Sequence, residues 1–292
     1  MTSLRSVQPR YAVTTGDLDH LTAAQARDYV RGVERAGFGM LWLAEVLGRE
    51  AFTTAQLALA ATSTMMIGNG VARALEREPK NAAAAQAGLC EAYPGRYVLG
   101  LGVSGAVRDR GVGPVPFMAG YLDEIDRNLA RTGHTTPAWR VLGAYSEGLT
   151  RLAARRADGL LTFLVTPEHT AWARSVLGPE PFLAVAQWVV PSTDRDEVRA
   201  VARRALRYYL GLPHQLNKLR RLGFTDDDLA PPGSDRLIDT LVASGPPDRI
   251  EAHLRQHFDA GADQVAISLL GPAPADKAAS YRDLAVALGQ AV

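Results

Sequence analysis

Residues 23–44 read AAQARDYVRGVERAGFGMLWLA, which combines a helical pattern, a turn and a buried strand in one stretch. Apolar residues recur at helical spacing through its first half, and Thr22 before it is a residue type that caps helices. Gly37 stands where helices commonly end on glycine. The run Phe38–Ala44 is apolar, which is typical of a strand buried on both faces of a parallel sheet.

The same pairing of helix and strand repeats along the chain. The predicted strands are 11–13, 38–44, 65–67, 97–101, 138–144, 159–165, 182–190 and 265–270. Strands that alternate with helices predict a parallel α/β fold, either a closed (β/α)8 barrel or an open doubly wound sheet. The number of strands, and the absence of a GxGxxG motif between the first strand and the first helix, favour the TIM barrel.

Residues 211–246 interrupt this alternation. They contain Pro213, the acidic run Asp226–Asp228 and the sequence PPGS at 231–234. We predict short helices here, inserted near the seventh helix of a single domain that spans residues 1–292.

Composition excludes several classes of protein. The 292 residues carry 32 Lys+Arg and 31 Asp+Glu, a net charge of +1 that argues against nucleic-acid binding. Cys90 is the one cysteine, so no internal disulfide can form, and its place among alanines predicts a packing role. No apolar stretch approaches the roughly 18 residues of a membrane span, and the N-terminal MTSLRSVQPR has no signal segment. We therefore expect a cytoplasmic protein.

Six segments carry a more specific signal. They are GFGMLWLAE (37–45), LALAATSTMMIGNGV (57–71), YPGRYVLGLGVSG (93–105), FMAGYLDEID (117–126), LAARRADGLLTFLVTPEH (152–169) and HFDAGADQVAISLL (257–270). Together they resemble the luciferase-like monooxygenase family, and more narrowly its actinobacterial branch that depends on the deazaflavin coenzyme F-420. The resemblance covers nearly the whole chain. It implies a homodimeric barrel that holds F-420 or FMN in its mouth and acts on a small organic substrate by hydride transfer, or by oxygen insertion when the cofactor is FMN.

The resemblance also implies which residues form the site. The family has an acidic residue near the ring or substrate at the position of Glu45, our candidate catalytic residue; a structural ion pair with Arg73 or Arg77 is the alternative. A non-proline cis peptide is implied between Gly70 and Val71. The implied cofactor-binding residues are Gly70, Val71, Ala72, Arg73, Arg77, Ala144, Tyr145, Ser146, Thr162, Phe163 and Leu164.

Four positions depart from the family pattern. Val46 stands where the best-studied branch has a histidine, and Gly105 where other members carry glutamate or histidine. Glu147 places a negative charge in the first turn of a predicted helix capped by Ser146, where the family binds the cofactor phosphate, so we expect weaker phosphate binding. Residues 163–166 are largely apolar where relatives carry small polar or basic side chains.

These departures leave three hypotheses open. The first is an oxidoreductase that depends on F-420. FMN is the alternative cofactor and fits the resemblance less well. Alternatively the chain is a repurposed barrel that uses no cofactor and binds or transforms a small molecule, or it is a non-catalytic partner subunit of an active relative. The basic candidates for binding a phosphate are Arg73, Arg77, Arg108 and Arg110.

No metal site is predicted. His253 and His257 stand four residues apart but lack the HExxH pattern of a metal-binding helix, so we interpret them as part of a helix surface.

Overall fold

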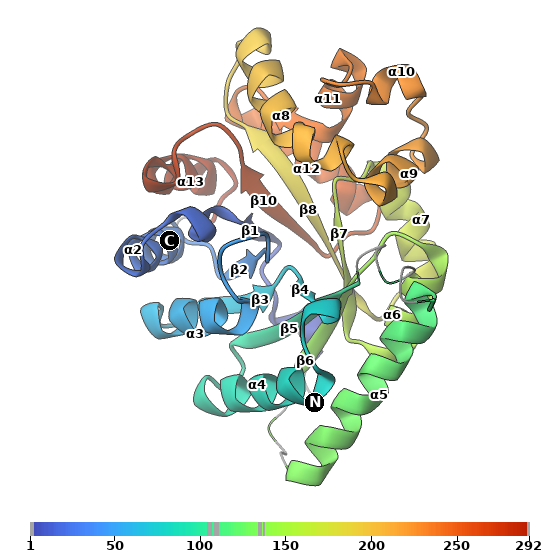
Figure 1. Ribbon diagram of the computed structural model, residues 1–292. Helices are drawn as coiled ribbons and strands as arrows, with labels where there is room; N and C mark the ends of the chain where they lie inside the picture. Colours follow the sequence, from blue (N-terminus) through green and yellow to red (C-terminus); the bar gives the residue numbers. More distant parts are fainter. Residues whose placement is uncertain (1–2, 104–106, 108–110, 134–135, 137, 291–292) are drawn as a thin grey trace.

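Eight parallel strands close into a barrel in the computed structural model, which describes residues 3–103, 107, 111–133, 136 and 138–290 (Figure 1). The barrel strands are β1 (Tyr11–Thr15), β2 (Met40–Leu43), β3 (Met66–Asn69), β5 (Tyr97–Gly102), β6 (Trp139–Gly143), β7 (Gly159–Phe163), β8 (Phe182–Val190) and β10 (Gln264–Leu269). Strand β10 pairs with both β1 and β8, which closes the sheet. The predicted (β/α)8 barrel is confirmed.

Helices cover the outside of the barrel between successive strands (Figure 1). They are α2 (Ala23–Arg35), α3 (Ala51–Ala61), α4 (Pro79–Ala92), α5 (Pro114–Thr132), α6 (Glu147–Arg156), α7 (Pro167–Leu177), α8 (Arg195–Leu210), α12 (Pro247–Asp259) and α13 (Lys277–Ala287). The short elements of the main body are α1 (Leu4–Val7), β4 (Ala72–Arg73) and the 3-10 turns η1 (Asp17–His20), η2 (Ala74–Glu76) and η4 (Pro274–Asp276). Within the described ranges, no helix is both long and apolar enough to cross a bilayer.

Local sequence explains where the helices begin. Thr22 and Gln25 form the capping box of α2. Helix α3 begins directly after Glu50, whose carboxylate caps it by accepting hydrogen bonds from the N–H groups of Phe52 and Thr53. Cys90 is buried in α4, and burial raises the pKa of its thiol to about 11, which confirms its packing role.

The apolar core has two layers. One lies between the strands and the helices, and the other fills the inside of the barrel. Inside the barrel the indole N–H of Trp42 donates a hydrogen bond to the side-chain oxygen of Gln264 at 2.7 Å. A Cβ atom at Gly68 would lie 2.4 Å from the Trp42 ring, so only glycine leaves room for this large side chain.

The insertion forms short helices, as predicted: α9 (Pro213–Arg221), α10 (Asp226–Leu229) and α11 (Asp235–Leu241). It also contains a strand that the sequence did not indicate, β9 (Val242–Ser244), which pairs with the last residues of β8. With α8 these helices form a lobe at the carboxyl end of β8, at the top of Figure 1. The lobe therefore stands over the barrel end at which (β/α)8 enzymes carry their active sites.

Candidate functional site

The rim of the barrel has a bulge after β3. A cis peptide bond joins Gly70 and Val71, at the position that the resemblance implies. The side chain of Val71 lies against the ends of the next two strands, where a Cβ atom at Gly102 would come within 2.3 Å of it and one at Gly143 within 2.9 Å. The two glycines therefore leave the space that Val71 occupies. Ala72, which follows in β4, is buried.

Glu45 is held in a buried ion pair. Its carboxylate accepts hydrogen bonds from both terminal nitrogens of the Arg77 guanidinium, from the backbone N–H of Arg73 at 2.7 Å and from that of Ala51 at 3.2 Å. Burial alone lowers the pKa of Arg77, but the hydrogen bonds and negative charge of Glu45 outweigh it and raise the pKa. The structure thus contains the ion pair that the sequence left as the alternative to a catalytic Glu45.

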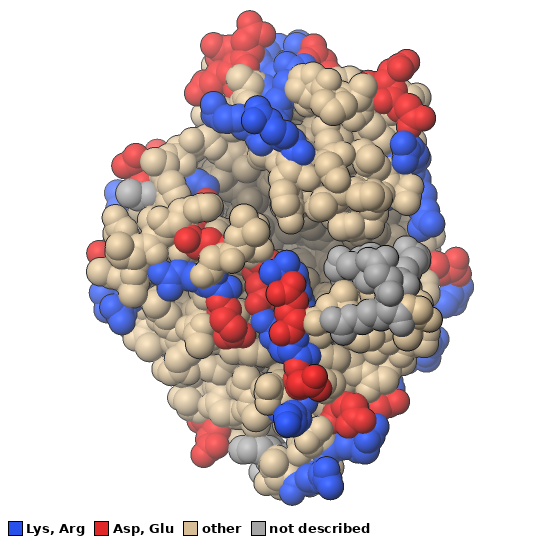
Figure 2. All heavy atoms as spheres, in the orientation of Figure 1, with Lys and Arg blue, Asp and Glu red and all other residues tan. Residues whose placement is uncertain are grey.

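A hollow separates the lobe of α8 to α11 from the barrel body, and charged side chains gather beside it (Figure 2). At this rim, a cavity of about 340 Å³ lies between the end of β6, the start of α6 and helix α9. Its lining consists of Val103, Pro114, Gly143, Ala144, Tyr145, Ser146, Leu149, His214, Asn217, Lys218 and Arg221. Three predicted cofactor-binding residues, Ala144 to Ser146, are therefore brought together here with basic side chains of the insertion.

Lys218 is the most buried charged group of this cavity, at 3% exposure. Its ammonium nitrogen donates a hydrogen bond to the backbone carbonyl oxygen of Phe163 at 3.0 Å and lies 5.4 Å from the centre of the Tyr145 ring. Burial lowers the pKa of Lys218 to about 7, because the charged form loses its hydration. An anion beside it would restore the preference for the charged form.

Helix α6 presents its first turn to the same cavity. Ser146 occupies the N-cap position, but its side chain makes no capping hydrogen bond. The first N–H groups of a helix carry partial positive charge and bind anions readily. Glu147 does not line the cavity: its exposed carboxylate pairs with Arg151, one turn further along the helix, at 2.7 Å. The repulsion predicted from Glu147 is therefore offset by a positive partner, and Glu147 is not part of the cavity lining.

The residues of this cavity fit the anionic end of a phosphorylated cofactor. Lys218, Arg221 and His214 supply positive charge or hydrogen-bond donors, and the start of α6 supplies backbone donors. Gly143 lines the cavity and also contacts Val71, so the bulge adjoins it. The volume lies within the range typical of ligand sites, roughly 300–1,000 Å³.

Comparison with known proteins identifies the family. The luciferase-like monooxygenase family matches residues 5–264, most of the chain. The chain belongs to this family. A search of curated proteins finds no significant match.

Solved structures of the luciferase-like fold agree with this assignment. The coenzyme F-420-dependent tetrahydromethanopterin reductase from Methanopyrus kandleri is 15% identical, with a TM-score of 0.74 over 96% of this chain and 97% of that one. An F-420-dependent secondary alcohol dehydrogenase, in complex with an F-420-acetone adduct, is 14% identical, with a TM-score of 0.71 over 98% and 100%. The oxygenating constituent of 3,6-diketocamphane monooxygenase from Pseudomonas putida, in complex with FMN, is 14% identical, with a TM-score of 0.65 over 96% and 97%. At these identities the likeness concerns the fold.

The apolar residues at the end of β7 pack beneath the insertion of this luciferase-like barrel. The ring of Phe163 contacts those of Trp188 and Tyr209, with centroids 5.7 Å and 5.3 Å away. Thr162 and Leu164 are buried, and Leu164 has a positive φ of 53°. None of these side chains lines the cavity at α6. The apolar residues at 163–166, which depart from the family pattern, therefore form the contact between β7 and the lobe of α8 to α11.

The other departures fall in different surroundings. Val46 lies near Gly16, where an added Cβ would come within 2.9 Å of the valine side chain, so its role is packing beside the rim. Gly105, Arg108 and Arg110 lie outside the described residues.

His257 corrects one interpretation made from the sequence. It is fully buried, not on a helix surface. Its Nδ1 lies 2.9 Å from the hydroxyl of Thr170 and its Nε2 3.1 Å from the side-chain oxygen of Gln187. Burial lowers the pKa of His257 to about 4, so the ring is neutral and serves as a hydrogen-bonded part of the core between α12, α7 and β8.

The basic residues of α9 were missed by the sequence analysis. His214, Lys218 and Arg221 recur at the spacing of one helical face, and this pattern was the available signal. It falls in the segment that interrupts the barrel repeat, so nothing local relates it to the start of α6.

Proposed function

We propose that this chain is an F-420-dependent oxidoreductase that transfers hydride between the deazaflavin and a small organic substrate, with FMN as the alternative cofactor. One observation carries the proposal: the start of α6 and the basic residues of α9 line a single cavity at the carboxyl end of the barrel. The F-420-dependent relatives of similar fold support it. The bound cofactor would supply the hydride chemistry, and the protein would supply binding, orientation and exclusion of water.

The residues of the chain take distinct roles in this proposal. Lys218, Arg221 and the first N–H groups of α6 bind the cofactor phosphate. Val71, held against Gly102 and Gly143, shapes the rim beside that phosphate. Glu45 fixes the loop after β2 through Arg77 and the backbone of Arg73.

The proposal is tested by titrating the purified protein with F-420 and, separately, with FMN, following tryptophan fluorescence and thermal stability. A specific ligand at a hundredfold excess over its Kd stabilises the fold by about 2.7 kcal/mol. We expect Lys218→Met to weaken binding about tenfold or more, since a charged hydrogen bond is lost. Glu147→Gln is the control, because this residue lies outside the cavity, and we expect less than about a twofold change.

A second candidate is a barrel that works without a redox cofactor. It is favoured by Thr162, Phe163 and Leu164, which the sequence predicts to bind the cofactor but which do not line the cavity at α6. Absence of any thermal shift or fluorescence change with both F-420 and FMN would support this second candidate against the first.

A further inference from the structure

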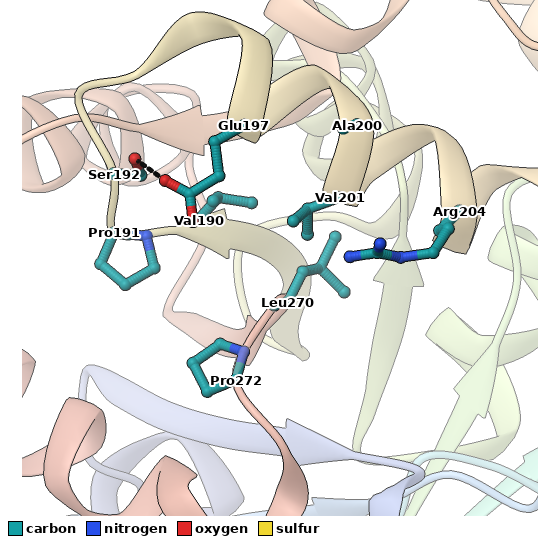
Figure 3. Close-up of a pocket in the computed structure, with 10 residues that line it drawn as sticks. Val190, Pro191, Ser192, Glu197, Ala200, Val201, Arg204, Leu270 and Pro272 are labelled. Carbon is teal, nitrogen blue, oxygen red and sulfur yellow. Dashed lines mark hydrogen bonds between the residues drawn. The ribbon is translucent and has the colours of Figure 1, made fainter.

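A second cavity, of about 410 Å³, lies between α8 and the carboxyl ends of β8 and β10 (Figure 3). The two strands pair in register as far as Val189 and Leu269, so Val190 and Leu270 continue side by side into the cavity. This is the edge at which (β/α)8 barrels carry their reactive and binding groups.

The lining of this cavity is apolar in the middle and charged at both ends. Val190, Val201 and Leu270 form the apolar part. Glu197 and Arg204 flank it, and Figure 3 shows both side chains extending from α8 beside Val201. They stand seven residues apart, close to two helical turns, so their backbones are separated by roughly 10 Å along the same side of the helix.

Arg204 differs from its neighbours on α8. Arg195, Arg199 and Arg203 each pair with an aspartate of α11 at 2.6–2.9 Å. Arg204 lines the cavity instead, and no carboxylate among the described residues pairs with it. An unpaired guanidinium beside apolar surface is suited to bind a carboxylate through two parallel hydrogen bonds.

Glu197 provides the opposite charge at the other end. The hydroxyl of Ser192, just after β8, donates a hydrogen bond to its carboxylate at 2.5 Å (Figure 3). This contact fixes the carboxylate at the end of the strand and uses part of its capacity as an acceptor. Within the described part of the chain, no lysine or arginine pairs with Glu197. The remaining acceptor positions of the Glu197 carboxylate suit the N–H donors of an ammonium group.

We propose that this cavity binds the substrate, and that the substrate carries a carboxylate at one end and an amino group at the other, joined by an apolar segment no longer than the roughly 10 Å between the two backbones. Arg204 pairs with the carboxylate, Glu197 with the amino group, and Val190, Val201 and Leu270 cover the apolar segment. That the ligand is a substrate rests on the proposed function. This cavity and the cavity of Lys218 open on the same end of one barrel.

Calorimetric titration of the purified full-length chain with ω-aminooctanoate tests the proposal. Octanoate and octylamine, which each lack one charged end, are the matched ligands. Because Glu197 and Arg204 are both exposed, we expect ω-aminooctanoate to bind about two- to fivefold more tightly than either, and Arg204→Gln or Glu197→Gln to remove that advantage. Arg207→Gln is the control variant, because Arg207 is exposed on the same helix and does not line the cavity.

Equal affinity for the three ligands, or unchanged affinity in both cavity variants, overturns the proposal. Parallel titrations with F-420 and FMN separate it from the proposed function. If ω-aminooctanoate binds as expected and neither cofactor does, the redox function fails and the binding site stands. If a cofactor binds and ω-aminooctanoate does not, only this inference fails.

Discussion

The ammonium nitrogen of Lys218, on α9, lies 3.0 Å from the backbone carbonyl oxygen of Phe163, at the end of β7. This hydrogen bond joins the insertion to the barrel beside the cavity at α6. Because the lysine is buried there, its charge depends on what occupies the cavity, and the contact links the insertion to anion binding.

Anion binding should therefore depend on pH. Burial lowers the pKa of Lys218 to about 7, so in the empty site this lysine loses its positive charge as the pH rises through that value. We expect the affinity for sulfate, whose charge is constant across the neutral range, to fall as the pH is raised above about 7. A bound anion favours the charged lysine and moves this midpoint upward.

The neighbouring groups allow this effect to be assigned. Burial and the charge of Lys218 lower the pKa of His214 below its ordinary value, so His214 titrates at lower pH than Lys218. Lys218→Met should show weak, nearly constant sulfate affinity across the same range in calorimetry. A wild-type protein with a flat profile above neutral pH would contradict the assigned role.

Replacing Glu45 by glutamine should destabilise the fold. Glu45 and Arg77 side chains are 6% and 9% exposed, and removal of one partner of a buried pair typically costs about 3–5 kcal/mol. Arg73→Gln is the comparison: its side chain is 38% exposed and 3.8 Å from Glu45, so we expect a loss under about 1 kcal/mol. Urea denaturation measures both. If Glu45→Gln leaves stability unchanged and abolishes turnover, Glu45 is catalytic and not structural.

The barrel could be predicted because its signals are local. Each strand is a short apolar run bounded by turn residues, and Phe38–Ala44, for example, contains the observed strand β2. Such a run needs burial on both faces, and closing the sheet under helices provides it. The bulge at Gly70 and Val71 followed from the resemblance and not from local pattern.

The cavity at α6 could not be predicted in the same way. Ser146 and Lys218 line the same cavity only because α9 lies across the rim. Local periodicity in the sequence does not show this placement of α9. The effect of Glu147 on anion binding depends on Arg151, one turn later, whose guanidinium pairs with the Glu147 carboxylate. The burial of His257 could not be predicted, because the sequence of α12 shows its polar residues but not the contacts that bury them. These contacts come from Thr170, in α7, and Gln187, in β8.

His257 should make the fold less stable in acid. Its pKa in the folded protein is about 4, below its ordinary value of 6.5, so the unfolded chain binds the extra proton first. The stabilisation from a neutral His257 is full above the ordinary pKa and is lost as the pH falls toward 4. Comparison of His257→Gln with the wild type isolates this group, since His169, His214 and His253 share the direction of shift.

The expected difference is large enough to measure. We expect the wild type to lose up to about 3 kcal/mol more than His257→Gln between neutral pH and pH near 4, in urea denaturation. Parallel curves for the two proteins would show that His257 titrates normally and is accessible to water.

The packing of Val71 against Gly102 predicts a coupled pair of substitutions. A Cβ atom at Gly102 would lie 2.3 Å from Val71 Cγ2, so Gly102→Ala should cost about 1–3 kcal/mol by overpacking. Val71→Ala removes that atom, and the same Gly102→Ala change should then cost much less, which a double-mutant cycle in denaturant measures. Gly120→Ala in α5, where a Cβ meets nothing within 4 Å, is the control and should stabilise the helix by about 0.5–1 kcal/mol. An equal penalty for Gly102→Ala with and without the valine would mean that Val71 does not occupy the space that the two strand-end glycines leave.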